Sequence, residues 1–356
     1  MNSLNNIERA QIPYDIISNY IKLYKSIGNN HYNHKTLESD NAVMVRQTIA
    51  KDVQYFAHIF GVKMSEGRIK SLIYKGVLPK NKEERLIINL HNAFTKVHNE
   101  TSTFELLPTE IFDLLHFLFS DVVSEKKLQF NKVQKTAKKV TLLSSNYTSK
   151  RDTLEELIAR FNEMRKENKF EVSFLIVSFY IDFLKSDIFT DKNKEIALVL
   201  LYILLVTNEF EVYEYISFFE AIYINIEEFD KVLLSSMYNW EEGFNNVISI
   251  HRFVLKISLI AYDHINSFIR DYEFDKNLNK SDNIENTINK LDDIFSKDEI
   301  RSVHPYISDS TINRTLKRLR DEDKIRPLGK GRSAKWIKLY TTPTKKISYE
   351  QLDLKI

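Results

Sequence analysis

The chain has 356 residues, of which 43% are hydrophobic; it contains 7 Gly and 6 Pro but no Cys, and its formal net charge is +2. At roughly 150 residues per domain, this length predicts two or three domains, and the hydrophobic content excludes a disordered chain. All-β sandwiches, barrels and propellers need a turn signal about every 8–12 residues. So few Gly and Pro exclude those classes, and we expect a mostly α fold.

The absence of Cys excludes disulfides, thiolate nucleophiles and Cys-based zinc sites. The N-terminus shows no signal-peptide pattern. The longest apolar run, Ile196 to Val206, is 11 residues, short of the ~20 that a membrane helix needs. We therefore expect a soluble, cytoplasmic protein without membrane contact.

Apolar residues spaced three and four apart predict a series of helices along most of the chain. The expected helices are 12–27, 43–60, 84–97, 108–119, 153–166, 171–185, 195–206, 213–224, 226–237, 244–268 and 283–295. The segment from Lys126 to Arg151 is basic and only weakly periodic. It favours a small β-hairpin, with 139–143 as one candidate strand.

Composition divides the chain into four parts. We expect an N-terminal helical region at 1–100, a helical core at 101–274, a polar linker at 275–282 and a separate module at 283–345. Residues 301–356 carry 14 Lys/Arg and 6 Asp/Glu, which leaves a net charge of −6 on the first 300 residues. A basic C-terminal segment on an acidic body is typical of a polyanion-binding module, although a merely solvated basic face has the same composition.

The C-terminal module shows a clear local pattern. After the helix 283–295, Ser296 is placed to cap a second helix, and Ser308 or Asp309 a third that runs to about Asp321. At 100° per residue, Ile312, Leu316 and Leu319 form the core stripe of this third helix. Its opposite face collects short polar residues and cations, which suit base edges and phosphates respectively.

Two alternating segments, 324–328 and 335–339, flank the basic turn Gly329-Lys330-Gly331-Arg332 and predict a hairpin. Three helices followed by such a hairpin resemble the winged helix-turn-helix family. A winged helix used only for protein contacts is the alternative, but the basic excess favours DNA. The expected DNA-binding residues are Ser310, Thr311, Asn313, Arg314, Lys317, Arg318, Lys330, Arg332 and Lys335.

A second pattern lies in the middle of the chain, where two apolar helices flank a polar loop from Asp187 to Glu195. This arrangement resembles the Fic family, which transfers AMP or related groups onto protein hydroxyls. The family loop reads His-Pro-Phe-x-Asp-Gly-Asn-Gly-Arg, and Phe189, Asp191 and Asn193 keep three of its positions. Upstream, Glu66 and Gly67 resemble the element that carries the family's autoinhibitory glutamate. A Fic core followed by a winged helix is an arrangement known in that family.

The departures from the family loop argue against AMP transfer. Asp187 replaces the general-base His, and a carboxylate with a pKa near ~4 is poorly matched to proton transfer at neutral pH. Lys192 and Lys194 replace the two glycines, so their side chains obstruct phosphates and resist left-handed dihedrals. Glu195 replaces the phosphate-binding Arg. We therefore expect no confident catalytic residue.

Part of the loop still suits an anion. Asp191 matches the family's metal-contacting carboxylate and Asn193 its phosphate-contacting amide, while Lys192 and Lys194 supply positive charge. The loop thus leaves room for residual binding of Mg²⁺ or a nucleotide, although no cofactor is expected. The alternative is that Asp191 and Asn193 only cap the following helix, and that Glu66 is a solvated residue.

No His-Glu-x-x-His or Gly-x-Ser-x-Gly motif occurs, so we expect no metal site. The resulting hypothesis is a DNA-binding regulator, acting as a homodimer, with a catalytically inactive Fic-like core. A divergent Fic-type AMP transferase is the first alternative. A protein-interaction factor that does not bind DNA is the second.

Overall fold

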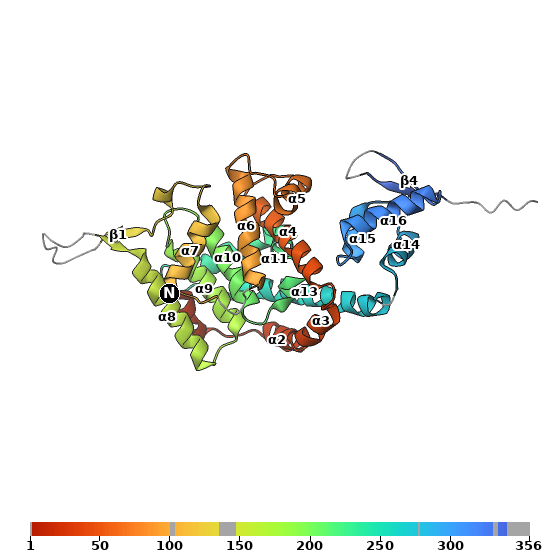
Figure 1. Ribbon diagram of the computed structural model, residues 1–356. Helices are drawn as coiled ribbons and strands as arrows, with labels where there is room; N and C mark the ends of the chain where they lie inside the picture. The colour runs from red at the N-terminus through yellow and green to blue at the C-terminus, as the bar shows by residue number, and fades with distance from the viewer. Residues whose placement is uncertain (1, 100–103, 135–146, 277, 330–333, 340–356) are drawn as a thin grey trace, which may run out of the picture. The chain divides into compact units, whose positions relative to one another are not determined.

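The computed structural model describes residues 2–99, 104–134, 147–276, 278–329 and 334–339. The chain forms two compact units, Met1–Ile269 and Arg270–Ile356. Figure 1 shows that helices make up most of the first unit. The mostly α class that the scarcity of Gly and Pro predicts is therefore confirmed.

The first unit begins with short helices and ends in a long one. Its elements before the β-hairpin are α1 (Asn2–Asn6), η1 (Ile7–Arg9), α2 (Tyr14–Ile27), α3 (Asn30–Leu37), α4 (Asn41–Ile59), α5 (Glu66–Lys75), α6 (Lys82–Asn99), α7 (Pro108–Phe119) and η2 (Glu125–Lys127). After the hairpin come α8 (Lys150–Glu167), α9 (Val172–Ser186), α10 (Asn193–Val206), η3 (Glu211–Glu214), α11 (Phe218–Ile224), α12 (Ile226–Met237) and α13 (Ile248–Asp275). The sequence does not predict α1, α3 and α5, which are short or weakly periodic.

Helices α9 and α10 form the centre of the first unit, side by side in Figure 1. Every residue of α10 from Ile196 to Val206 is buried, and so is every residue of α9 from Ser173 to Phe183. A helix that is apolar all round has to be covered on all sides. Helices α1 and α8 pack on α9, and the loop between α9 and α10 is thereby held at one end of a rigid pair.

The expected hairpin is present between Lys126 and Arg151. Strands β1 (Lys132–Gln134) and β2 (Tyr147–Ser149) pair antiparallel, with Lys132 opposite Ser149. The candidate strand 139–143 lies outside the described residues. The hairpin leads into α8, whose first turn is capped by the Ser149 side chain accepting from the Arg151 N–H.

The first hundred residues belong to the same unit as the core. Asp182 of α9 is fully buried, and its carboxylate accepts the backbone N–H groups of Ser3 and Leu4 at 2.8 and 3.0 Å. Helix α4 packs on both α6 and α11. The division expected after residue 100 therefore does not coincide with the boundary between the two units. Contacts between residues so far apart in the sequence leave no signal in its composition.

Within its described residues, the second unit contains the end of α13, three further helices and a three-stranded antiparallel sheet. Its elements after the end of α13 are α14 (Lys280–Lys290), β3 (Ile294–Phe295), α15 (Lys297–Val303), α16 (Asp309–Asp321), β4 (Ile325–Pro327) and β5 (Trp336–Lys338). The strand order is β3-β5-β4. The helix expected at 283–295 ends at Lys290, because Ile294 and Phe295 pair with β5 instead.

The local signals in this unit correspond to its structure. Ser296 caps α15 in a capping box with Glu299, and Ser308, rather than Asp309, caps α16. Ile312, Leu316 and Leu319 are buried, as the core stripe predicts. The boundary between the two units follows Ile269 and so lies before the expected linker 275–282. Helix α13 continues past this boundary to Asp275, and α14 begins at Lys280.

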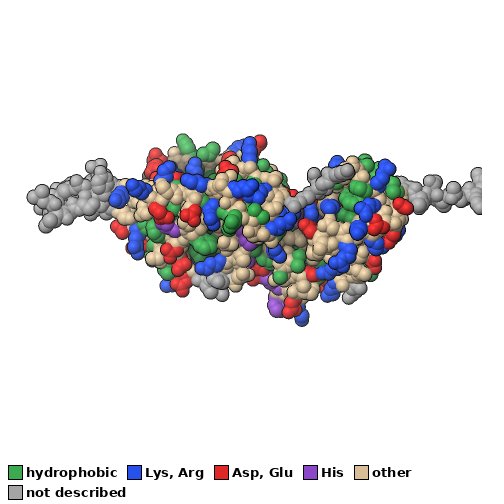
Figure 2. Space-filling model, turned by 45° about the horizontal axis from the view of Figure 1, so that its top comes forward, with side chains coloured by type: hydrophobic (Ala, Val, Ile, Leu, Met, Phe, Trp, Pro, Cys, Tyr) green, Lys and Arg blue, Asp and Glu red, His purple; other side chains and the backbone are tan. Residues whose placement is uncertain are grey.

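Surface charge alone does not mark a site. Figure 2 shows Lys and Arg side chains interspersed with Asp and Glu over the face that it presents. Within the described ranges, no helix combines the length and the hydrophobicity needed to cross a membrane.

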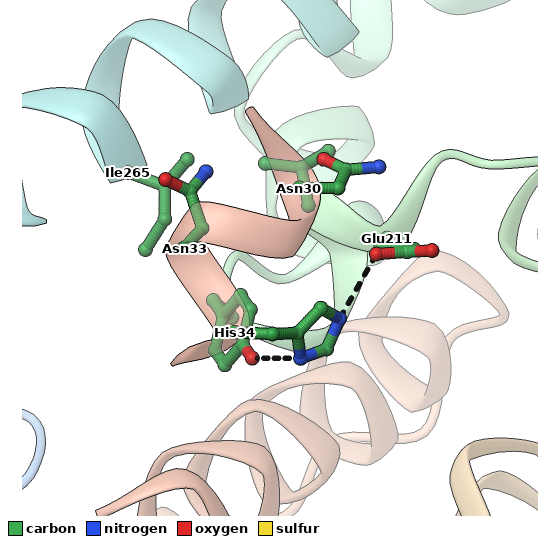
Figure 3. Close-up of a pocket in the computed structure, with 7 residues that line it drawn as sticks. Asn30, Asn33, His34, Glu211 and Ile265 are labelled. Carbon is green, nitrogen blue, oxygen red and sulfur yellow. Dashed lines mark hydrogen bonds and ion pairs between the residues drawn. The ribbon is translucent and has the colours of Figure 1, made fainter. Parts of the chain in front are cut away.

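A small pocket lined mainly by polar residues lies between α3 and other parts of the first unit (Figure 3). His34 Nε2 lies 2.9 Å from a carboxylate oxygen of Glu211 and 3.8 Å from one of Glu214, and its Nδ1 lies 2.8 Å from the Tyr215 hydroxyl. The hydrogen bond with Glu211 raises the pKa of His34. Burial raises the pKa of Glu214 to about 7, although the nearby His34 charge opposes this shift.

These two groups make the stability of the pocket depend on pH. The pKa of each group is higher in the folded state than in the unfolded state. Above the unfolded-state pKa, the folded protein therefore binds more protons than the unfolded chain. The free energy of unfolding consequently falls as pH rises through the folded-state pKa. We expect Glu214→Gln to gain about 1 kcal/mol in free energy of unfolding, relative to wild type, between pH 6 and pH 8. Urea unfolding at both pH values measures this. Glu227→Gln, on the exposed side of α12, is the control, and an equal pH dependence in both variants would contradict the assignment.

Candidate functional site

The loop between α9 and α10 is tied together by one buried amide. Asn193, the first residue of α10, is 9% exposed. Its Oδ1 accepts the backbone N–H groups of Ile188 at 3.0 Å and Phe189 at 3.2 Å. Its Nδ2 faces the carbonyl oxygens of Phe183 and Leu184 at 3.5 and 3.4 Å. Both polar atoms of this amide therefore have partners within the protein.

Phe189 anchors the middle of the loop in an aromatic cluster. Its side chain is 1% exposed. Its ring lies 5.1 Å from that of Phe130 and 6.1 Å from that of Phe183, and Phe112 stacks on Phe130 at 4.9 Å. Aromatic pairs at such separations add to the hydrophobic stabilisation of burial. The position that Phe189 shares with the Fic loop is thus explained by packing.

The segment before β1 lies along the loop and is bonded to it. The backbone N–H of Asn131 donates to the Ile188 carbonyl at 2.8 Å. Its side-chain Nδ2 donates to the carbonyls of Asp187 and Phe189, at 2.8 and 2.9 Å, and to the Asp187 carboxylate at 3.0 Å. Thr190 N–H donates to the Gln129 carbonyl at 2.9 Å. Sequence reasoning does not find Asn131, because its partners lie 56 or more residues away.

Lys192 and Glu195 neutralise each other at the start of α10. Lys192 Nζ lies 2.8 Å from Glu195 Oε1, and their side chains are 27% and 15% exposed. Glu195 sits in the first turn of α10, where a carboxylate is stabilised by the partial positive charge of the helix N-terminus. The protein's own anion therefore lies where a bound phosphate would be favoured.

The backbone of the loop keeps left-handed positions without glycine. Lys192 has φ +64° and Asp187 has φ +47°. The resistance expected of a side chain at position 192 does not prevent this conformation, because the hydrogen bonds around it hold the turn. Lys194 is exposed in the first turn of α10, where helical dihedrals are normal for any residue.

Asp187 and Asp191 are the two carboxylates at the loop surface. Asp187 is exposed, ends α9 and receives the Asn131 amide. Asp191 Oδ1 accepts the Lys192 N–H at 2.8 Å, and its Oδ2 lies 4.0 Å from Lys127 Nζ. Within the described part of the chain, no group of three or more His, Asp or Glu side chains is arranged to hold a metal ion.

Glu66 and Gly67 each interact with a residue of their own helix, α5. Glu66 starts α5 and forms an ion pair with Lys70, one turn along the same helix. Gly67 follows it in the first turn, and its carbonyl accepts the Ser71 hydroxyl. Among the described residues, no hydrogen bond or ion pair joins Glu66 to the loop 187–195.

The expected DNA-binding residues of α16 fall into two groups. Arg314 and Lys317 are exposed and, within the described residues, form no ion pair. Arg318, by contrast, pairs with Glu285 of α14 at 2.7 Å and with Glu322 at 3.0 Å, and these partners raise its pKa. Arg314 and Lys317 are therefore the α16 cations that are available to a ligand.

The polar candidates on α16 are partly engaged. The hydroxyls of Ser310 and Thr311 lie 2.8 and 3.0 Å from that of Ser308, and Asn313 Oδ1 accepts Lys297 Nζ at 2.7 Å. Lys335 is exposed just before β5. Lys330 and Arg332 lie outside the described residues. Lys297 is a cation beside the candidate face that sequence reasoning misses, since it belongs to α15.

Comparisons with known proteins place this geometry in a fold. No family model matches the sequence, and no curated protein matches it either. A Fic family protein from Desulfovibrio desulfuricans superposes with a TM-score of 0.53 at 14% identity, covering 93% of this chain and 98% of that one. A fragment of Fic-1 from C. elegans gives 0.51 at 13% identity, covering 71% of this chain and 73% of that one.

The first alignment must include residues of both units, because the first unit ends at Ile269 of 356 residues. At these identities the likeness concerns the fold alone. The chain has a mostly helical, Fic-like fold.

Proposed function

We propose that this protein is a DNA-binding regulator whose Fic-like core does not transfer AMP. The observation that carries the proposal is that Arg314 and Lys317 of α16 are exposed and form no ion pair with any residue that the structure describes. They lie on a helix that is capped, amphipathic and packed on α14. Such a helix can present charge to a phosphate backbone without first breaking internal ion pairs.

The order of elements in the second unit supports a winged helix. Helices α15 and α16 follow each other through a short connection, and the β4–β5 hairpin comes next. In the helix-turn-helix arrangement, the second helix of the pair enters the major groove and its N-terminal residues contact base edges. Here that helix is α16, with Ser310 and Asn313 exposed near its start.

Electrostatic binding to DNA depends on cations that are free to meet phosphates. Arg314 and Lys317 meet this condition, and Lys335 adds a third exposed cation at the hairpin. Arg318 has a structural role instead, because Glu285 binds both Arg318 and Lys324 and so ties α16 and the start of the hairpin to α14. Arg318 is therefore removed from the set of residues that the sequence predicts to contact DNA.

The loop of the first unit supports the absence of transfer chemistry. The residue at the general-base position is a carboxylate, Asp187, already bound by Asn131. The position of the phosphate-binding Arg carries Glu195, paired with Lys192. Asn193, which would contact a phosphate, is buried and spends its hydrogen bonds on the loop. These groups stabilise the loop and leave none free for a nucleotide.

The DNA proposal predicts a salt-dependent interaction that two residues control. We expect the full chain to shift a mixed-sequence duplex at about 50 mM salt, with affinity falling steeply toward about 200 mM. Arg314→Ala and Lys317→Ala should each reduce the slope of log affinity against log salt by about one. Lys194→Ala, which removes the same charge from the first unit, is the control. Absence of binding at low salt, or equal effects of all three variants, would refute the proposal.

The core proposal predicts that AMP transfer is absent. With labelled ATP and Mg²⁺, we expect no label on the chain or on added protein, because Asp187 is already bound by Asn131 and the position of the phosphate-binding Arg carries Glu195, paired with Lys192. An active Fic transferase run in parallel is the positive control. Labelling that is lost in Asp191→Ala would instead favour the divergent transferase.

A structural role for the loop predicts a stability effect at Asn193. Asn193→Ala leaves the buried N–H groups of Ile188 and Phe189 without an acceptor, and each such group costs about 1–3 kcal/mol. We expect the free energy of unfolding, measured in urea, to fall by about 3 kcal/mol. The exposed neighbour Lys194→Ala should change it by less than about 0.5 kcal/mol. Similar values for both variants would show that the amide does not hold the loop.

A further inference from the structure

Helix α2 carries an exposed apolar stripe along one face. Tyr14, Ile17, Ile21 and Tyr24 are 85%, 44%, 69% and 42% exposed. Their spacing of three, four and three residues places them within an 80° arc of one helix face. Single exposed apolar residues are ordinary, but an aligned row of large ones is typical of a contact surface.

The stripe sits on a helix that is held in place. Ile16 and Leu23, about 130° around α2 from the centre of the stripe, are completely buried. Asp15 in its first turn pairs with Arg252 of α13 at 2.6 Å, and the Tyr24 hydroxyl donates to Glu171 at 2.9 Å near its end. These contacts fix the orientation of α2 on the first unit, with the four side chains facing outward.

The stripe is also symmetric in sequence. Read from either end, it is Tyr, Ile, Ile, Tyr with the same spacings, centred on Asn19. A two-fold axis through that centre places Tyr14 against the same stripe's Tyr24 in a second copy, and Ile17 against Ile21. Isologous interfaces need such self-complementary surfaces, whereas an unrelated partner requires no such symmetry.

The helix dipole favours the same antiparallel arrangement. Antiparallel pairing places the N-terminal end of each α2 beside the C-terminal end of the other and so opposes the two helix dipoles. Parallel pairing would align them. The side chain of Asp15 is already paired with Arg252 and adds nothing to this preference.

We propose that α2 is a homodimer interface, in which two copies pack antiparallel through Tyr14, Ile17, Ile21 and Tyr24. This surface goes beyond the proposed function, because it is argued from the first unit alone and does not require DNA binding. One helix from each copy forms a small contact compared with the ~800 Å² per partner of a standard interface. A dimer that dissociates on dilution is therefore expected.

The oligomeric state of the full chain tests the surface without DNA. Sedimentation velocity over a concentration series should show a monomer–dimer equilibrium for the wild type. Ile17→Glu with Ile21→Glu should weaken the dimer by about 100-fold or more, since four carboxylates would be buried together. Ile224→Glu with Leu234→Glu, at residues 71% and 68% exposed on α11 and α12, should leave it unchanged. A chain that is monomeric throughout, or an equal effect of both double variants, overturns the proposal.

Cysteine cross-linking tests the orientation, because the chain has no native Cys. A mixture of Tyr14→Cys and Tyr24→Cys chains should form disulfide-linked dimers between the two variants. Tyr14→Cys alone should not, since the antiparallel pair separates those positions by ~15 Å along the axis, beyond the ~7 Å between Cα atoms that a disulfide spans. Efficient linkage of Tyr14→Cys to itself, or no linkage in the mixture, contradicts the arrangement.

Discussion

The buried amide of Asn193 is the interaction on which the candidate site depends. Helices α9 and α10 are apolar all round, so they must lie together in the centre of the first unit and be joined by a short loop. That loop carries backbone N–H groups of buried residues, and each buried N–H needs an acceptor. The side-chain oxygen of Asn193 accepts two of them, those of Ile188 and Phe189. This fixes the backbone of Phe189, and with it the place of its ring among the aromatic neighbours.

The same constraint explains how this loop holds its turn although several positions differ from the Fic loop that it resembles. Residues that hold the turn, such as Phe189 and Asn193, are internal to the fold. Positions that would meet a nucleotide carry groups that satisfy each other, as Lys192 and Glu195 do. A Lys in a left-handed conformation costs about 1–2 kcal/mol relative to Gly, and the surrounding hydrogen bonds offset that cost. Retained residues in such a loop are therefore weak indicators of retained catalysis.

Much of the fold is readable from the sequence because helices leave periodic patterns. The stripe of Ile312, Leu316 and Leu319, and the caps at Ser296 and Ser308, are local signals and appear as expected. Contacts between distant segments have no such signal. Asn131 on the loop and Asp182 on the N-terminal residues are determined by packing, so the site's supporting residues and the unity of the first 269 residues are not predictable locally.

Composition likewise cannot separate a cation that stabilises the protein from one that binds a ligand. Arg314 and Arg318 lie one turn apart on α16 and look equivalent in the sequence, yet only Arg318 meets Glu285 across the unit. A carboxylate of the same chain holds a cation without the entropic cost of association that a separate molecule carries. To bind that cation, a phosphate therefore has to displace the carboxylate. Among the described residues, Arg314 has no such competitor. Net charge therefore overstates the surface that a polyanion can use, and the pairing of each cation decides which part of a basic segment is functional.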